Sequence, residues 1–214
     1  VERAGQISNF QKEKYFNVEL DCDGIPAVKP KIFDPDEAEQ LRSRCHGNEA
    51  IVTSVKETEK KVKAPKLYDL TTLQREANRI YGMTAKQTLD TAQSLYEKKL
   101  ITYPRTDSQY LTEDMEQTAR NVVRQIYEKY QLTGPFDQPE QPDVKKVMNN
   151  SKVTDHHAII PTLELASCHL DELKSWEEKI LFLIAVHTVM AMSKDHIYQE
   201  TEIEVECQGE IFKA

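Results

Sequence analysis

"YDLTTLQREANRIYGMTAKQTLDTAQSLYEKKLITY", residues 68–103, decides the fold of the middle of this 214-residue chain. In its first part, apolar residues recur every three or four positions over 70–81, which predicts one face of an α-helix. Gly82 stands where a left-handed residue would end that helix. Thr84 and Gln87 have the spacing of a capping box, so they predict that a second helix begins there.

The second helix is expected to continue to about residue 98. Its apolar face is expected to contain Ala85, Leu89, Ala92, Leu95 and Tyr96. The residues that follow, KKLITY (98–103), predict a short strand. Two helices joined by a tight glycine turn and followed by a strand have the outline of a helix-turn-helix with a wing. Many helix pairs share this outline without binding DNA.

Strand-like sequences lie near both ends of the chain. YFNVELDC (15–22) and ETEIEVEC (200–207) alternate apolar and polar residues, and AIVTSV (50–55) is rich in β-branched residues. Between them, further helices are predicted over about 112–130 and from a capping box at Ser175–Glu178. The sequence therefore predicts an α+β protein in which a mostly helical, winged-helix-like module is inserted into a β-rich one.

The expected domain boundaries follow from these patterns. The β-rich module is expected to consist of residues 1–66 and 194–214, and the helical module of residues 67–193. Within the helical module, LTGPFDQPEQPD (132–143) is rich in proline and is expected to be a loop. Neither end of the chain resembles a natural terminus, so we expect the sequence to be a piece of a longer protein.

Composition excludes some classes of protein. The chain is 39% hydrophobic and 30% charged, which is typical of a soluble globular domain, and it has no apolar run long enough to cross a membrane. Its net charge of −8 argues at first sight against nucleic-acid binding. Residues 66–109, with seven basic and five acidic side chains, are nevertheless net positive, whereas residues 110–214 carry a charge of −9.

The cysteines do not suggest a metal site. None of the four forms a C-x-x-C pair, so a zinc site is poorly supported. Cys22 and Cys207 each continue an apolar stripe, where a reduced core thiol is the simplest interpretation. This pattern suits a reducing, cytoplasmic compartment.

The strongest candidate for chemistry is Tyr103, within LITYPRTDS (100–108). A tyrosine at the end of a strand usually only packs. Here, however, Pro104 restricts Tyr103 to an extended backbone, and Arg105 then leaves the chain on the same side as Tyr103. A phenol attacks a phosphate poorly unless charge is stabilised nearby, and a guanidinium matches phosphate oxygens well. Thr106 and Asp107 supply a hydroxyl and a carboxylate that either orient Arg105 or form an ordinary turn.

A second candidate is the histidine pair in VTDHHAIIPT (153–162). A metal site is disfavoured because no further ligand lies at a suitable spacing. Either His156 and His157 are simply solvated or hydrogen-bonded, or His156 donates to a backbone phosphate of a bound strand.

Together, LYEKKLITYPRTDSQYL (95–111) and DHHAIIPT (155–162) resemble type IA DNA topoisomerases, and their details are most similar to the topoisomerase III branch. The resemblance implies that Tyr103 attacks the DNA backbone and becomes linked to the 5′ phosphate. It also implies that Arg105 holds the scissile phosphate and that His156 contacts DNA. We count Thr106, Asp107 and His157 as further DNA-binding candidates.

The resemblance also implies the surroundings of this chain. The β-rich module would be an arch that leads into and out of the nucleophile domain. A Toprim domain that binds Mg²⁺, and a fourth domain, would lie outside residues 1–214. We therefore expect this chain to hold no metal and to be inactive by itself. The complete enzyme is expected to be a monomer at the bacterial nucleoid that acts, without ATP, on single-stranded DNA and on duplexes with single-stranded regions.

Two alternatives from other classes stay open. One is a non-enzymatic winged-helix DNA-binding module that uses residues 84–98 as a recognition helix, with Tyr103 only packing. The other is an interaction domain without a nucleic-acid role, which the acidic stretch 110–214 favours slightly.

Overall fold

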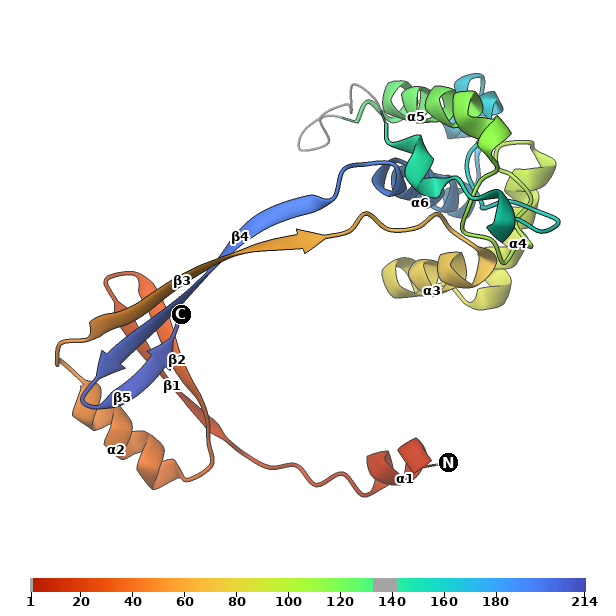
Figure 1. The fold of residues 1–214 in the computed structure, drawn as a ribbon. Helices are drawn as coiled ribbons and strands as arrows, with labels where there is room; N and C mark the ends of the chain where they lie inside the picture. The colour runs from red at the N-terminus through yellow and green to blue at the C-terminus, as the bar shows by residue number, and fades with distance from the viewer. Residues whose placement is uncertain (1, 133–141) are drawn as a thin grey trace. The chain divides into compact units, whose positions relative to one another are not determined.

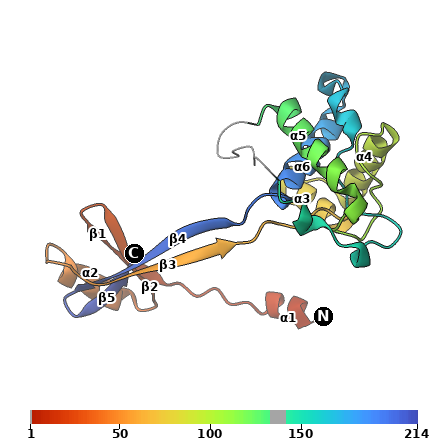
Figure 2. The same cartoon turned by 45° about the horizontal axis from the view of Figure 1, so that its top comes forward.

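The computed structural model describes residues 2–132 and 142–214. The chain forms two compact units. The first combines Val1–Lys61 with Ile197–Ala214, and the second is Val62–His196. The first contains the sheet and the second is mostly helical (Figure 1 and Figure 2). The predicted α+β class is therefore confirmed. Residues 133–141, most of the segment expected to be a proline-rich loop, lie outside the described residues.

The sheet of the first unit has five strands in the order β1-β2-β5-β4-β3. Neighbouring strands run antiparallel, and the long pair β3 and β4 lies side by side in Figure 1. β1 and β2 join through Asp23 and Gly24, whose φ angles of 53° and 89° suit a two-residue hairpin turn. The strands are β1 (Phe16–Cys22), β2 (Ile25–Ile32), β3 (Ile51–Val62), β4 (His196–Cys207) and β5 (Glu210–Lys213).

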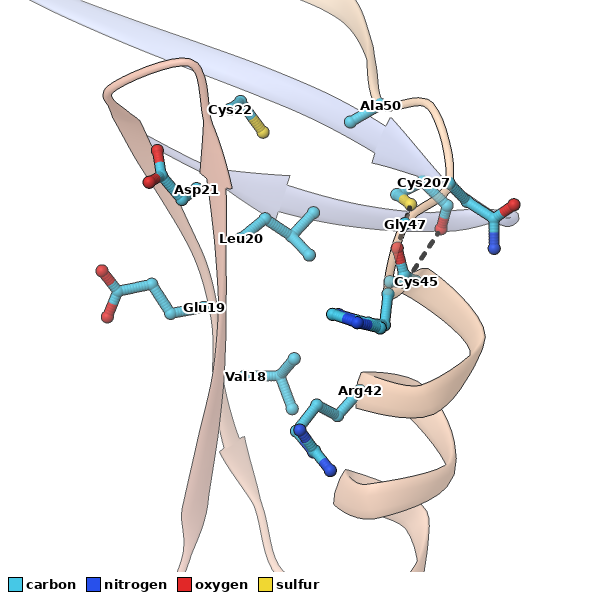
Figure 3. A pocket seen from close by; sticks show the side chains of 12 residues that line it. Val18, Glu19, Leu20, Asp21, Cys22, Arg42, Cys45, Gly47, Ala50 and Cys207 are labelled. Carbon is cyan, nitrogen blue, oxygen red and sulfur yellow. Dashed lines mark hydrogen bonds between the residues drawn. The ribbon is translucent and has the colours of Figure 1, made fainter.

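Two helices in this unit were not expected from the sequence. α1 (Glu2–Ser8) has no buried residue, whereas α2 (Pro35–Cys45) covers the sheet. Asp34 caps α2 and Pro35 occupies its first turn, a signal that the sequence did contain. The thiols of Cys45 and Cys207 each lie close to the other residue's carbonyl oxygen, at 3.7 and 3.9 Å, beside a cavity of about 340 Å³ (Figure 3). Within the described residues the four cysteines are free; Cys207 is buried as expected, whereas Cys22 is only partly buried.

The second unit packs three long helices around a fourth, α6, which is buried on most sides. Short 3₁₀ turns connect several of them. The long helices are α3 (Leu70–Tyr81), α4 (Ala85–Glu97), α5 (Glu116–Tyr130) and α6 (Ser175–Ala191). The 3₁₀ turns are η1 (Glu113–Met115), η2 (Val144–Val147), η3 (Asn150–Lys152), η4 (Leu163–Ala166) and η5 (Leu170–Glu172).

The local signals between α3 and α4 are confirmed. Gly82 has φ 68° and ends α3, where a residue with a side chain would be strained. Thr84 and Gln87 form the predicted capping box at the start of α4. The predicted apolar faces were partly wrong, because Ile80, expected on the face of the first helix, and Ala85 and Tyr96, expected on that of the second, are exposed. Thr88, which was not included, is buried in α4.

The expected strand at 98–103, which would form the wing, is wrong. Only a single antiparallel bridge forms there, between Ile101 and Pro161. Pro104 and Pro161 have no N–H to donate, so a regular ladder cannot extend through this pairing. The partner is a distant segment and not a hairpin strand.

The expected capping box at Ser175–Glu178 is also wrong. α6 does begin at Ser175, but its cap is Lys174, whose backbone N–H donates to the Glu177 carboxylate at 3.0 Å. Glu177 is buried and also binds groups from α4, so its tertiary contacts select it as the capping partner.

Candidate active site

Thr102 fixes the backbone immediately before Tyr103. Its N–H donates to the carbonyl of Ile160 at 3.0 Å. Its hydroxyl donates to the carbonyl of Ala158 at 2.9 Å and accepts from the Ile160 N–H at 3.0 Å. The segment that carries Tyr103 is therefore attached directly to the segment that carries the histidine pair.

Thr106 makes the corresponding connection after Tyr103. Its buried hydroxyl donates to the carbonyl of His156 at 3.0 Å and accepts from the Ser108 N–H at 3.1 Å. Its own carbonyl accepts from the N–H of Leu70, at the start of α3, at 3.0 Å. The loop between Thr102 and Thr106 is thus held at both ends.

The Tyr103 ring lies between two other aromatic rings. Its centroid is 4.3 Å from that of His156, with the planes tilted by 46°. The Tyr96 ring, from the last turn of α4, meets it edge-on at 5.3 Å and 75°. Tyr103 is half-buried, so its ring is supported by protein while part of it faces solvent.

Arg105 and Asp107, two and four residues after Tyr103, are exposed. Within residues 2–132 and 142–214, neither side chain has an ion-pair or hydrogen-bond partner, and the Tyr103 hydroxyl also has none. The phenol and the guanidinium, two residues apart on a fixed loop, are therefore free to bind a ligand. An anionic group such as a phosphate would satisfy both.

The other predicted DNA-binding residues are used differently in the structure. The Thr106 hydroxyl bonds within the protein, as described above. His157 is half-buried, and its Nδ1 lies 2.9 Å from the carbonyl of Ala158. His156 is exposed and contacts Tyr103. The structure therefore brings Tyr103, Arg105 and His156 onto one loop pair, with Thr106 and His157 supporting it.

An ion pair between a buried glutamate and a partly exposed lysine anchors the end of α4, from which this loop departs. The carboxylate of Glu177 accepts hydrogen bonds from Lys98 Nζ at 2.6 Å and from Ser94 Oγ at 2.7 Å. Burial alone would raise the pKa of Glu177, but these bonds and the Lys174 N–H lower it to about 2. The charged carboxylate therefore ties α4 to α6.

Sequence reasoning did not include Tyr96 in the site. Its spacing along α4 placed it on the expected apolar face, yet it is 40% exposed and its ring contacts Tyr103. The useful signal in the sequence was its position in the last turn of α4, shortly before the loop that carries Tyr103.

Neither a metal centre nor a membrane span is found in the described part of the chain. Among residues 2–132 and 142–214, no three His, Cys, Asp or Glu side chains gather where they could hold a metal ion. No helix in these ranges has both the length and the apolar character needed to cross a bilayer.

Comparison with known proteins identifies the family. The whole chain, residues 1–214, matches a family model described as DNA topoisomerase. The chain belongs to the type IA DNA topoisomerase family. It is 35% identical to the DNA topoisomerase 3 of Bacillus licheniformis and, equally, to that of Bacillus subtilis. Each alignment covers 100% of this chain and 30% of the relative.

A solved structure agrees with this assignment to the type IA family. Full-length topoisomerase I from Thermotoga maritima is similar over 100% of this chain and 35% of its own, with a TM-score of 0.73 and 28% identity. This topoisomerase chain spans about 30% of the length of its two Bacillus relatives.

Proposed function

We propose that this chain is the part of a type IA topoisomerase that carries the nucleophile, and that Tyr103 is that nucleophile. The helical unit would be the nucleophile domain, and the sheet unit would be the arch that leads into and out of it. The enzyme would break one DNA strand, pass another strand through the break and reseal it. Its substrate would be single-stranded DNA or a duplex with single-stranded regions.

The proposed reaction is a phosphoryl transfer. The Tyr103 oxygen bonds to the phosphorus as the bond from phosphorus to the 3′ oxygen breaks. The phenol loses a proton and the 3′ oxygen gains one, which leaves a 5′-phosphotyrosyl ester and a free 3′ hydroxyl. The reaction exchanges one phosphodiester bond, to the 3′ oxygen, for another, to the Tyr103 oxygen. The 3′ hydroxyl can therefore reverse the attack without ATP.

Each residue has a proposed role in this step. Arg105 holds the scissile phosphate through its planar guanidinium and stabilises its developing charge. His156 supports the Tyr103 ring and contacts DNA beside it. Asp107 lies at the exposed edge, whereas Thr106 and His157 hold the loops. The observation that carries the proposal is the contact between the rings of Tyr103 and His156, whose centroids are 4.3 Å apart. Arg105, two residues after Tyr103, has no partner among the described residues.

The resemblance also implies a magnesium ion in the complete enzyme. The described residues offer no cluster of ligands for it. On the family resemblance, we propose that it is bound by a Toprim domain outside this sequence. This chain alone is proposed to be inactive.

The test uses a longer protein that contains this chain. It is incubated with Mg²⁺ and single-stranded DNA labelled at the 3′ end, because the fragment that becomes attached is the one downstream of the break. After denaturation, proteolysis and mass spectrometry, the labelled adduct is expected on Tyr103. Tyr103→Phe should lose the adduct and keep DNA binding, whereas Tyr96→Phe should keep both.

The alternative is a non-enzymatic winged-helix module in which Tyr103 only packs. The capping box and glycine turn of α3 and α4 favour it, but the missing wing strand does not. An absent adduct, with DNA binding unchanged in Tyr103→Phe, would support this alternative. An adduct on a different residue would disprove the proposed nucleophile.

A further inference from the structure

A cavity lies in the helical unit where the chain enters and leaves it. Its volume is about 380 Å³, which is within the range of small-molecule and ligand sites. Polar side chains dominate its lining, and Tyr103, Arg105 and His156 do not contribute to it. The polar lining residues are Lys63, Lys66, Gln109, Tyr110, Lys146 and Asp195.

Two lysines lie over the ring of Tyr110 at this cavity. Lys66 Nζ is 5.6 Å from the ring centroid and Lys152 Nζ is 5.0 Å from it. The backbone of each lysine is fixed, because the Lys66 carbonyl bonds to His187 Nε2 at 2.7 Å and the Lys152 carbonyl accepts from Ser108 Oγ at 2.8 Å. The aromatic ring thus gathers two ammonium groups that would otherwise repel each other.

The charges around the cavity do not balance. Lys146 is paired with Asp195 at 2.8 Å, so its charge is compensated. In the described part of the chain, Lys63, Lys66 and Lys152 have no carboxylate partner. Three ammonium groups without a carboxylate partner therefore lie at or beside this cavity, in a chain whose net charge is −8. They form a local site for an anion.

Phosphate is the anion that this arrangement fits. Lysine ammonium groups bind phosphate as point charges, and Gln109 and the Tyr110 hydroxyl add hydrogen-bonding groups. Lys152 lies over the Tyr110 ring but does not line the cavity, so the cluster of lysines extends beyond the edge of the cavity. A strand with repeating phosphates matches this spread better than one small molecule does.

We propose that Lys63, Lys66 and Lys152, around Tyr110, bind the phosphodiester backbone of a DNA strand at a second contact site beyond Tyr103. The inference rests on the proposed function only in taking DNA as the ligand. The loop from Thr106 to Tyr110 then has two roles, because it follows the nucleophile at one end and contacts the strand at the other.

The experiment measures how salt weakens binding of a fluorescent single-stranded oligonucleotide to the 214-residue chain. Each phosphate contact contributes about 0.7 to the slope of log K against log salt for single strands. The double variant Lys66→Gln, Lys152→Gln is therefore expected to reduce the slope by about 1.4 and to weaken binding roughly tenfold at near-physiological salt.

Lys179→Gln is the matched control. Lys179 also lies over aromatic rings of the helical unit, 4.5 Å from the centroid of Trp176 and 5.8 Å from that of Tyr81. It should leave the slope unchanged. Thermal unfolding checks that each variant is folded, and the single variants replace the double one if that does not fold.

Three results would overturn the inference. The first is that the unmodified chain does not bind the oligonucleotide, and the second is that the lysine variants have the same salt slope as the unmodified chain. The third is that millimolar thymidine monophosphate displaces the oligonucleotide, which would indicate a site for small phosphates instead. None of them bears on the nucleophile, since a Tyr103 adduct in the longer protein is measured separately.

Discussion

The hydroxyl of Thr106 donates a hydrogen bond to the backbone carbonyl of His156 at 3.0 Å, across 50 residues of sequence. It also accepts from the Ser108 N–H at 3.1 Å, so one buried group connects the loop after Tyr103 to the segment with the histidine pair. The position of the His156 ring against Tyr103 depends on this connection. A defect in the site can therefore be introduced without altering either ring.

Thr106→Val keeps the shape of the side chain but removes both hydrogen bonds. Because the N–H of buried Ser108 is left unsatisfied and the bond to the His156 carbonyl is lost, we expect the free energy of unfolding to fall by about 1–3 kcal/mol. In a longer protein that contains this chain, adduct formation should also slow. Chemical denaturation measures the first effect and the labelled-DNA assay the second.

Thr91→Val is the control for this prediction. The Thr91 hydroxyl donates only to the Gln87 carbonyl, one turn back in α4, at 2.8 Å. Its loss should have little effect on stability or adduct formation. Equal behaviour of the two variants would show that Thr106 does not connect the loops.

Tyr96 tests whether the support of the Tyr103 ring matters for cleavage. Tyr96→Ala removes the edge-on contact at 5.3 Å, and aromatic pairs of this kind contribute about 0.5–1.5 kcal/mol. If that energy holds the nucleophile in position, single-turnover cleavage should slow about two- to tenfold while the Kd for DNA stays unchanged. Tyr96→Phe keeps the ring and should cleave normally. A change in Kd instead of the rate would assign Tyr96 to DNA binding.

Much of the helical pair α3 and α4 was predictable because its signals are local. Gly82 and the Thr84–Gln87 capping box act on their own backbone, and the structure confirms both. The start of α6 shows where prediction from local sequence signals fails. Lys174 and not Ser175 is the cap, because Glu177 is already committed to Lys98, 79 residues away. No pattern around residue 175 contains that partner.

The candidate site likewise has features that the local sequence predicts and features that depend on distant segments. Tyr103 and Arg105 could be selected from one loop, because Pro104 and the two-residue spacing act locally. The contact between Tyr103 and His156 depends on hydrogen bonds between distant segments, and the family resemblance suggested only that both residues meet DNA. Tyr96 was missed because helical spacing alone could not show that its ring leaves the core to meet Tyr103.

Glu177 predicts a dependence of stability on acidic pH. Its pKa is about 2 in the folded protein and 4.5 in the unfolded chain, so its stabilising effect is complete above about pH 4.5 and is lost as the pH falls towards 2. Glu177→Gln should lower the free energy of unfolding by on the order of 2 kcal/mol at pH 7 and by much less near pH 2. Denaturation across this range measures the difference. Glu178→Gln, at the exposed neighbouring position, should differ little from the unmodified chain in free energy of unfolding at any pH in this range.

His187 predicts a second pH dependence, near neutrality and of different origin. Burial lowers its pKa below the ordinary 6.5, since its ring stacks on Tyr68 at 3.7 Å. Below about pH 6.5 the unfolded chain therefore takes up a proton that the folded ring resists, and stability should fall as the pH decreases.

In His187→Gln this loss between pH 8 and pH 5.5 should be smaller, although the variant is less stable overall because the stacking is gone. Thermal unfolding at a series of pH values measures it, with His169→Gln, at an exposed position, as the control. The same ring holds the carbonyl of Lys66 at 2.7 Å, so His187→Gln should also weaken oligonucleotide binding if Lys66 contacts DNA. A pH profile parallel to that of the unmodified chain would show that His187 is not the titrating group.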